Sequence, residues 1–149
     1  MAETMARSTQ ATDTQPLAIH RHRLRVYFED TDAGGIVYYA NYLKFAERAR
    51  TEMMRDFGAT HAAMIDVTGA TFAVRRCEVD YLKPARLDDL LEIETAITDI
   101  GAATLDARQR VLRDDEELVR IQIRLACMNA DGRATRIPAT VREALNRNR

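Results

Sequence analysis

The sequence predicts one α+β domain, in which an antiparallel sheet of about five strands packs against one long helix. Three observations support this fold class: one stretch has helical spacing, several stretches alternate as half-buried strands do, and most links between those strands are short. Short links favour antiparallel pairing, and a helix with a wide apolar stripe has to bury that stripe against the sheet. A chain of 149 residues can build such a core.

The first strand is expected at residues 22–28, HRLRVYF, where every second side chain is apolar, ending with Phe28. The long helix is expected at 39–57, because its apolar positions recur every three or four residues. Gly58 is placed to end it. A short helix is expected at 61–66.

Four more strands follow, beginning with residues 71–82, which a K-P-A-R turn closes. The next three strands are predicted to turn one face to the helix, with these side chains: Leu91, Ile93, Thr95, Ile97; Leu105, Ala107, Gln109, Val111; Val119, Ile121, Ile123, Leu125, Cys127. A terminal helix is expected at 138–146. The sheet would expose its edge strands, and pairing between subunits is one way to cover an edge.

Composition excludes several classes of protein. Acidic and basic side chains nearly balance, 23 against 22, so no overall charge attracts the chain to nucleic acid or anionic lipid. Residues 1–19 lack the apolar core of a secretory signal and predict a disordered tail, which leaves residues 20–149 as the single domain. No later stretch is long and apolar enough for a membrane span, so we expect a cytoplasmic protein.

The two cysteines, Cys77 and Cys127, are far apart and each lies in an alternating segment. Without a C-x-x-C spacing they suggest neither zinc nor a redox pair, and we expect both to be reduced, half-buried strand residues.

The stretch E-D-T-D-A-G-G-I-V-Y-Y-A-N-Y, residues 29–42, places acidic groups on a glycine turn in front of the long helix. A calcium loop starting at Asp30 would need carboxylates where Gly34 and Asn41 stand, so that interpretation fails on two ligands. A magnesium-dependent phosphotransferase also uses D-x-D, but it needs further groups from a larger parallel sheet. No metal or other cofactor is predicted.

The same turn could instead serve an acyl carbonyl group. Gly34 and Gly35 let a ligand approach the main chain closely, and a helix that starts near Tyr38 offers unpaired N–H groups with a partial positive charge. Such donors could polarise a carbonyl oxygen beside an aspartate. If the helix starts later, Asn41 becomes an ordinary N-cap, and the turn itself could be no more than an aspartate hydrogen-bonded to its own backbone.

Two segments carry a family resemblance: V-Y-F-E-D-T-D-A-G-G-I-V-Y-Y-A-N-Y with F-A-E-R-A-R-T-E-M, and Y-L-K-P-A-R-L-D-D-L-L-E-I-E-T at 81–95. They closely resemble the acyl-CoA thioesterases associated with the Tol-Pal gene cluster, on the 4-hydroxybenzoyl-CoA thioesterase branch of the hot-dog superfamily. The similarity covers most of residues 21–140. It implies the hot-dog fold, a curved antiparallel sheet around one long helix, which agrees with the periodicity.

The resemblance also implies roles for particular residues. The catalytic carboxylate falls on Asp32, Asp30 supports the turn, and the carbonyl-polarising backbone amide falls at Tyr39. Gly35, with Tyr38 and Tyr39, would contact the substrate. The Tol-Pal-associated members usually have His at the position of Tyr39, but a backbone donor survives that change. Candidate partners for the CoA phosphates are Arg75, Arg76, Arg86, Arg133 and Arg136, although each is also an ordinary surface charge.

The expected function is therefore hydrolysis of short-chain or aromatic acyl-CoA thioesters, with Asp32 as nucleophile or as general base. The family likeness implies a homodimer or homotetramer with sites at subunit interfaces, and an acyl carrier protein is a possible alternative carrier of the thioester. The rival interpretation is a module that binds an acyl thioester or acyl carrier protein without turnover.

Overall fold

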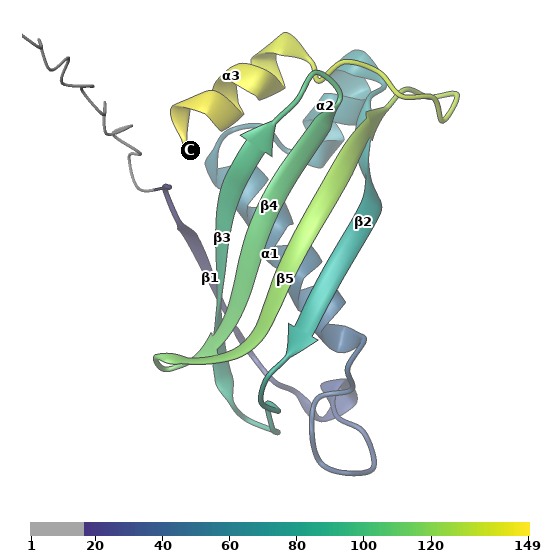
Figure 1. Cartoon of the computed structure of the whole chain (residues 1–149). Helices are drawn as coiled ribbons and strands as arrows, with labels where there is room; N and C mark the ends of the chain where they lie inside the picture. Colours follow the sequence, from purple (N-terminus) through teal and green to yellow (C-terminus); the bar gives the residue numbers. More distant parts are fainter. Residues whose placement is uncertain (1–16) are drawn as a thin grey trace, which may run out of the picture.

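The computed structural model describes residues 17–149 and forms one five-stranded antiparallel sheet (Figure 1). The strands are β1 (His20–Arg25), β2 (Thr71–Tyr81), β3 (Leu90–Ile100), β4 (Thr104–Arg113) and β5 (Glu116–Met128). Their order across the sheet is β1-β3-β4-β5-β2, with every neighbouring pair antiparallel. The predicted α+β fold class is thus confirmed, and β1 and β2 are the two edges of the sheet.

The long helix α1 (Asn41–Asp56) packs against β1, β3 and β4 on one face of the sheet. Figure 1 shows it crossing that face obliquely, with its first turn near the end of β2. The short helix α2 (His61–Thr68) contacts β2, and α3 (Ala139–Arg147) ends the chain. Gly58, with a φ of +76°, follows the end of α1 as predicted.

The side chains predicted to face the helix from β3, β4 and β5 are all buried, so the alternation identified the correct face of each strand. They form one core with the apolar stripe of α1, which includes Phe45, Ala46, Ala49 and Met53. Burial of these side chains is the main force that holds α1 on the sheet.

The prediction for the end of the first strand was wrong. Phe28 is 81% exposed, because the chain leaves the sheet after Arg25 and enters a 3-10 turn over Phe28–Asp30. The Asp30 carboxylate stabilises this turn by accepting from the Tyr27 backbone N–H across 2.8 Å. A polar side chain that bonds its own backbone has here overridden the strand pattern.

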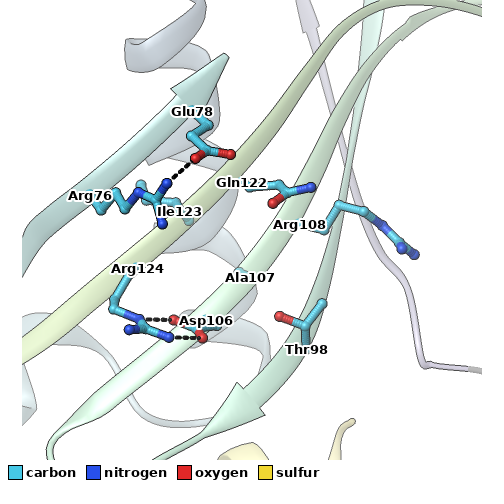
Figure 2. Close-up of a pocket in the computed structure, with 9 residues that line it drawn as sticks. All are labelled: Arg76, Glu78, Thr98, Asp106, Ala107, Arg108, Gln122, Ile123 and Arg124. Carbon is cyan, nitrogen blue, oxygen red and sulfur yellow. Dashed lines mark hydrogen bonds and ion pairs between the residues drawn. The ribbon is translucent and has the colours of Figure 1, made fainter. Parts of the chain in front are cut away.

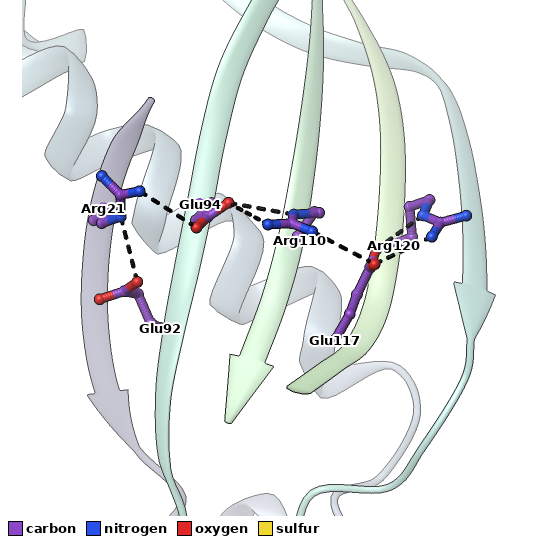
Figure 3. Close-up of polar contacts among 6 residues, drawn as sticks. All are labelled: Arg21, Glu92, Glu94, Arg110, Glu117 and Arg120. Carbon is purple, nitrogen blue, oxygen red and sulfur yellow. Dashed lines mark hydrogen bonds and ion pairs between the residues drawn. The ribbon is translucent and has the colours of Figure 1, made fainter. Parts of the chain in front are cut away.

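The opposite face of the sheet is charged. Arg21, Glu94, Arg110, Glu117 and Arg120 form a row of ion pairs across the strands (Figure 3). The strongest geometry in this ion-pair row is the two-pronged contact of Arg120 with the two carboxylate oxygens of Glu117, at 2.8 and 3.1 Å. Because alternating charges satisfy one another there, this face is a solvated surface and not a second core layer.

The predicted disordered tail, residues 1–19, lies outside the described residues except for 17–19, which are exposed and irregular. The single domain predicted for 20–149 contains all the helices and strands given above. Within residues 17–149, no helix combines the length and the apolar character that crossing a bilayer requires.

Candidate active site

The acidic turn lies between β1 and α1 and is closed by backbone hydrogen bonds. The Asp32 N–H donates to Ile36 O across 2.9 Å, and the Gly35 N–H donates to Asp32 O across 3.0 Å. Gly35 has a φ of +77°, a left-handed conformation that favours glycine. The turn is therefore a defined structure, and residues 32–35 form its tip.

The Asp32 side chain is exposed and bonds to the turn itself. Its Oδ1 accepts from the Gly34 backbone N–H across 2.8 Å. Oδ2 has no hydrogen-bond partner in the part of the chain that the structure describes. One carboxylate oxygen is thus fixed by the main chain, while the other is available to a substrate or to water.

Asp30 ties the turn to the start of α1. Besides capping Tyr27 with its carboxylate, it accepts through its main-chain oxygen from the Tyr38 N–H and from Nδ2 of Asn41, both across 2.9 Å. These contacts are those of a supporting residue, as the family resemblance implies. They hold the tip of the turn at the N-terminal end of the helix.

The start of α1 differs from the prediction. The helix begins at Asn41, two residues later than the spacing suggested, because Tyr39 and Ala40 form a turn before it. Asn41 is nevertheless no N-cap: its side chain reaches back to Asp30, and the N-cap residue Ala40 provides no side-chain acceptor. In residues 17–149 the Tyr39 backbone N–H has no acceptor, so it remains a free donor at the helix entrance.

Three tyrosines surround this entrance. Tyr38 and Tyr39 are 46% and 60% exposed, with ring centres 4.9 Å apart. Tyr81, from the end of β2, places its ring 6.1 Å from that of Tyr39 and donates to the Tyr39 main-chain oxygen across 3.1 Å. Tyr42 is buried and accepts from the Ala85 N–H, so it belongs to the core. Tyr38, Tyr39 and Tyr81 thus present an accessible aromatic surface.

Three hollows in the surface of residues 17–149 lie elsewhere. One hollow of about 330 Å³ is on the charged face of the sheet (Figure 2). There Arg124 donates two hydrogen bonds to the Asp106 carboxylate, at 2.7 and 2.8 Å, and Arg76 pairs with Glu78. Others of about 260 and 310 Å³ lie over the ion-pair row and on the exposed face of α1. Asp32 lines none of these three, so one chain alone leaves the acidic turn open to solvent.

Other predicted residues have plain structural explanations. Of the candidate phosphate partners, Arg76 is already paired with Glu78. Cys127 is fully buried and Cys77 is exposed, so the prediction that both are half-buried was wrong. Cys77 is exposed because α1 packs mainly against β1, β3 and β4 and leaves much of β2 uncovered. Across residues 17–149, no three His, Cys, Asp or Glu side chains gather as metal ligands would.

The sequence reasoning missed a buried polar cluster under α1. Nη1 of Arg50 donates to Oε1 of Gln109 across 2.9 Å, and Nε2 of Gln109 donates to Ala46 O and to Thr95 Oγ1 across 2.9 and 3.0 Å. Arg50 and Gln109 are 9% and 0% exposed. The available signal was position: Arg50 follows Ala46 by four residues, which places a charged side chain on the apolar stripe.

Comparisons with known proteins identify the family of the chain. The model of the thioesterase-like superfamily matches residues 26–145. Among curated relatives, the acyl-CoA thioesterase YbgC of Haemophilus influenzae is 42% identical over 106 residues, 71% of this chain and 78% of its own length. The acyl-CoA thioester hydrolase YbgC of Escherichia coli O6:H1 is 46% identical over 101 residues, 68% and 75% of the two chains.

Solved structures show the same fold. A probable thioesterase from Bartonella henselae is 35% identical and superposes with a TM-score of 0.79, covering 81% of this chain and all of that one. A protein from Aquifex aeolicus is 29% identical with a TM-score of 0.80, covering 84% and 98% of the two chains. The chain therefore belongs to the thioesterase-like superfamily, as a thioester hydrolase with the hot-dog fold.

Proposed function

We propose that the chain hydrolyses short-chain or aromatic acyl-CoA thioesters, with Asp32 as the catalytic carboxylate. The observation that supports the proposal is that two groups near the start of α1, Oδ2 of Asp32 and the backbone N–H of Tyr39, have no hydrogen-bond partner within residues 17–149. The names of the YbgC relatives support the choice of acyl-CoA as substrate.

The chemistry needs few groups. In the transition state the thioester carbonyl oxygen gains negative charge, and the Tyr39 N–H at the helix entrance is placed to stabilise it. The leaving thiolate is the conjugate base of a thiol with a pKa of about 8.5, so it departs without a strong acid. Asp32 either attacks the carbonyl carbon, giving a mixed anhydride that water cleaves, or removes a proton from the attacking water.

The surroundings of these groups fit a substrate. Gly35 has no side chain to obstruct the carbonyl group, and Tyr38 and Tyr39 offer flat apolar surface to an acyl or aryl group. We infer that the acidic turn becomes a closed site when a second copy of the chain covers it, in a homodimer or homotetramer. An acyl carrier protein as the carrier of the thioester, and a cytoplasmic location, stay predictions of the sequence.

The test is to replace Asp32 by Asn and by Ala and to follow free thiol released from a panel of acyl-CoAs. We expect kcat to fall by about 100-fold or more while binding of acyl-CoA is largely kept, since the carboxylate acts mainly in the transition state. Asp131→Asn, in an exposed turn at Asp131–Gly132, is the matched control and should behave as wild type.

Two other results would count against the proposal. If the wild type binds acyl-CoA but releases no thiol, the chain is a binding module without turnover. If EDTA abolishes the activity, a metal-dependent reaction replaces the one described.

A further inference from the structure

Arg50 is a buried cation without an anionic partner in the part of the chain that the structure describes. Its guanidinium bonds to the neutral amide of Gln109, and no carboxylate of residues 17–149 lies within 4 Å of it. Glu47, one turn earlier on α1, lies on the exposed face of the helix, and its negative charge opposes the lowering of the Arg50 pKa that burial causes. Buried cations in proteins are usually paired, so this one has unused capacity for an anion.

The remaining guanidinium nitrogens of Arg50 still reach solvent. Only Nη1 has a hydrogen-bond acceptor in residues 17–149, yet no nitrogen of this side chain is both fully buried and unpaired. Part of the guanidinium is therefore in contact with solvent, and its unpaired N–H groups could donate to a ligand.

The edge strand β2 is only partly covered on the side that faces α1. On its helix-facing side Val74 is 54% exposed, Tyr81 is 47% exposed and Cys77 is exposed, although their partners on β5 are buried. We call these three residues the open strip. The charge of Arg50 acts on this region: burial raises the pKa of the Cys77 thiol, and Arg50 opposes that rise.

His61, at the start of α2, is also close enough to Arg50 for its charge to act on the imidazole. Burial lowers the pKa of its imidazole, and the positive charge of Arg50 lowers it further, whereas Glu47 acts in the opposite direction. The raised pKa of Cys77 disfavours its thiolate, which would neutralise the guanidinium. The lowered pKa of His61 disfavours its imidazolium, which would add a second positive charge beside it. The cation remains available to an incoming anion.

The open strip begins beside the proposed oxyanion donor. Tyr81 bonds to the main-chain oxygen of Tyr39, and from there β2 runs back past Cys77 to Val74. The guanidinium lies near the level of Ala46, because Gln109 bonds to both. Ala46 lies five residues beyond Asn41, the first residue of α1, a rise of about 7.5 Å along the axis. A thioester held at the helix entrance would reach that level with an acyl group of several carbons.

We propose, on the basis of the thioesterase function proposed above, that Arg50 is a specificity-determining residue that binds a carboxylate at the far end of the acyl group. The preferred substrates are then short dicarboxylic acyl-CoAs, whose chain lies along the open strip. A charge-assisted, two-pronged contact between guanidinium and carboxylate would supply the selectivity.

The experiment compares kcat/KM within pairs of equal chain length: succinyl- against butyryl-CoA, glutaryl- against pentanoyl-CoA, and adipoyl- against hexanoyl-CoA, each corrected for hydrolysis without enzyme. We expect the wild type to prefer the dicarboxylic member of at least one pair by about 10-fold or more, because the neutral analogue leaves the buried cation unpaired. Arg50→Gln should reduce that ratio to about one, and Arg50→Lys should restore part of it.

Arg48→Gln is the matched control, since Arg48 is an exposed arginine on the same helix, and it should keep the wild-type ratio. Circular dichroism and light scattering report whether each variant folds and assembles. A wild-type ratio of one or less at all three lengths overturns the inference even if Arg50→Gln does not fold. An unchanged ratio in Arg50→Gln also overturns the inference. If that variant loses its assembly but keeps the ratio, Arg50 belongs to a subunit contact and the inference is again overturned.

These outcomes are separate from the fate of the thioesterase proposal. Hydrolysis of the neutral acyl-CoAs that depends on Asp32, without preference for the dicarboxylic ones, removes only the role of Arg50. No hydrolysis of any of the six compounds removes the function and this inference together.

Discussion

The Gly34 backbone N–H donates to Oδ1 of Asp32 across 2.8 Å, so the turn that carries the proposed catalytic carboxylate also orients it. The contact leaves little room at Gly34, where an added Cβ would lie 3.1 Å from the same oxygen. A side chain held by its own backbone in this way needs no further residue to fix its direction.

Replacement of Gly34 by Ala should therefore lower activity more than stability. The new methyl group displaces the Asp32 carboxylate by a few tenths of an ångström, and a small misplacement of a catalytic group is costly. We expect kcat to fall by about 10-fold, with a melting temperature within a few degrees of wild type. A variant with wild-type kcat would show that the Asp32–Gly34 contact does not orient the reactive carboxylate.

Substitution at Tyr39 should separate the backbone from the side chain. Tyr39→Phe keeps the N–H and is expected to retain kcat within about 3-fold, whereas Tyr39→Pro removes the donor and should lower kcat by about 100-fold. The Tyr39 N–H has no acceptor in residues 17–149, so its loss breaks no hydrogen bond of the fold. Thiol-release kinetics, with a melting curve for each variant, measure the difference; equal kcat for the two variants would remove Tyr39 from the oxyanion site.

Much of this fold could be predicted from the sequence, because the alternation of apolar and polar residues along a strand indicates which face of the strand is buried. Thr95 and Gln109 were assigned to the buried face on position alone, although both are polar, and both are buried. The errors occur where a local hydrogen bond competes with the pattern, as Asp30 does when it turns Phe28 out to solvent. The alternation of apolar and polar residues describes the sheet alone and does not reveal such side-chain caps.

The site was less predictable, for a different reason. The motif and the family resemblance give Asp32 and Tyr39 as candidates, but periodicity says only that a face is apolar, not how much of that face a helix covers. The oblique path of α1 leaves Cys77 exposed and brings Arg50 to Gln109, a residue 59 positions away. Contacts of that kind depend on how the helix packs, which a single sequence does not specify.

Tyr42 provides a test of the core beside the site. Its hydroxyl accepts from the Ala85 N–H across 2.9 Å, and both residues are buried. Tyr42→Phe leaves that N–H without an acceptor and should lower the free energy of unfolding by about 1–3 kcal/mol, with little change in kcat. Urea denaturation measures the effect. Tyr81→Phe, which removes an exposed hydroxyl, is the control and should cost less than about 0.5 kcal/mol.

The pair of Asp106 and Arg124 predicts how stability depends on pH. The two hydrogen bonds from the Arg124 guanidinium hold the pKa of the Asp106 carboxyl below its ordinary value. A carboxyl whose pKa is lowered by folding stabilises the protein above its unfolded pKa of about 3.9, and that contribution is lost as the pH falls through the folded value.

Asp106→Asn should therefore destabilise the protein at pH 7, by about 0.5 kcal/mol for a pair at the surface, and the difference from wild type should disappear as the pH drops below about 4. Urea denaturation across this pH range measures both curves. Asp115→Asn, in an exposed turn, is the control and should follow the wild type throughout. A difference that persists unchanged at low pH would mean that Asp106 acts through packing and not through its charge.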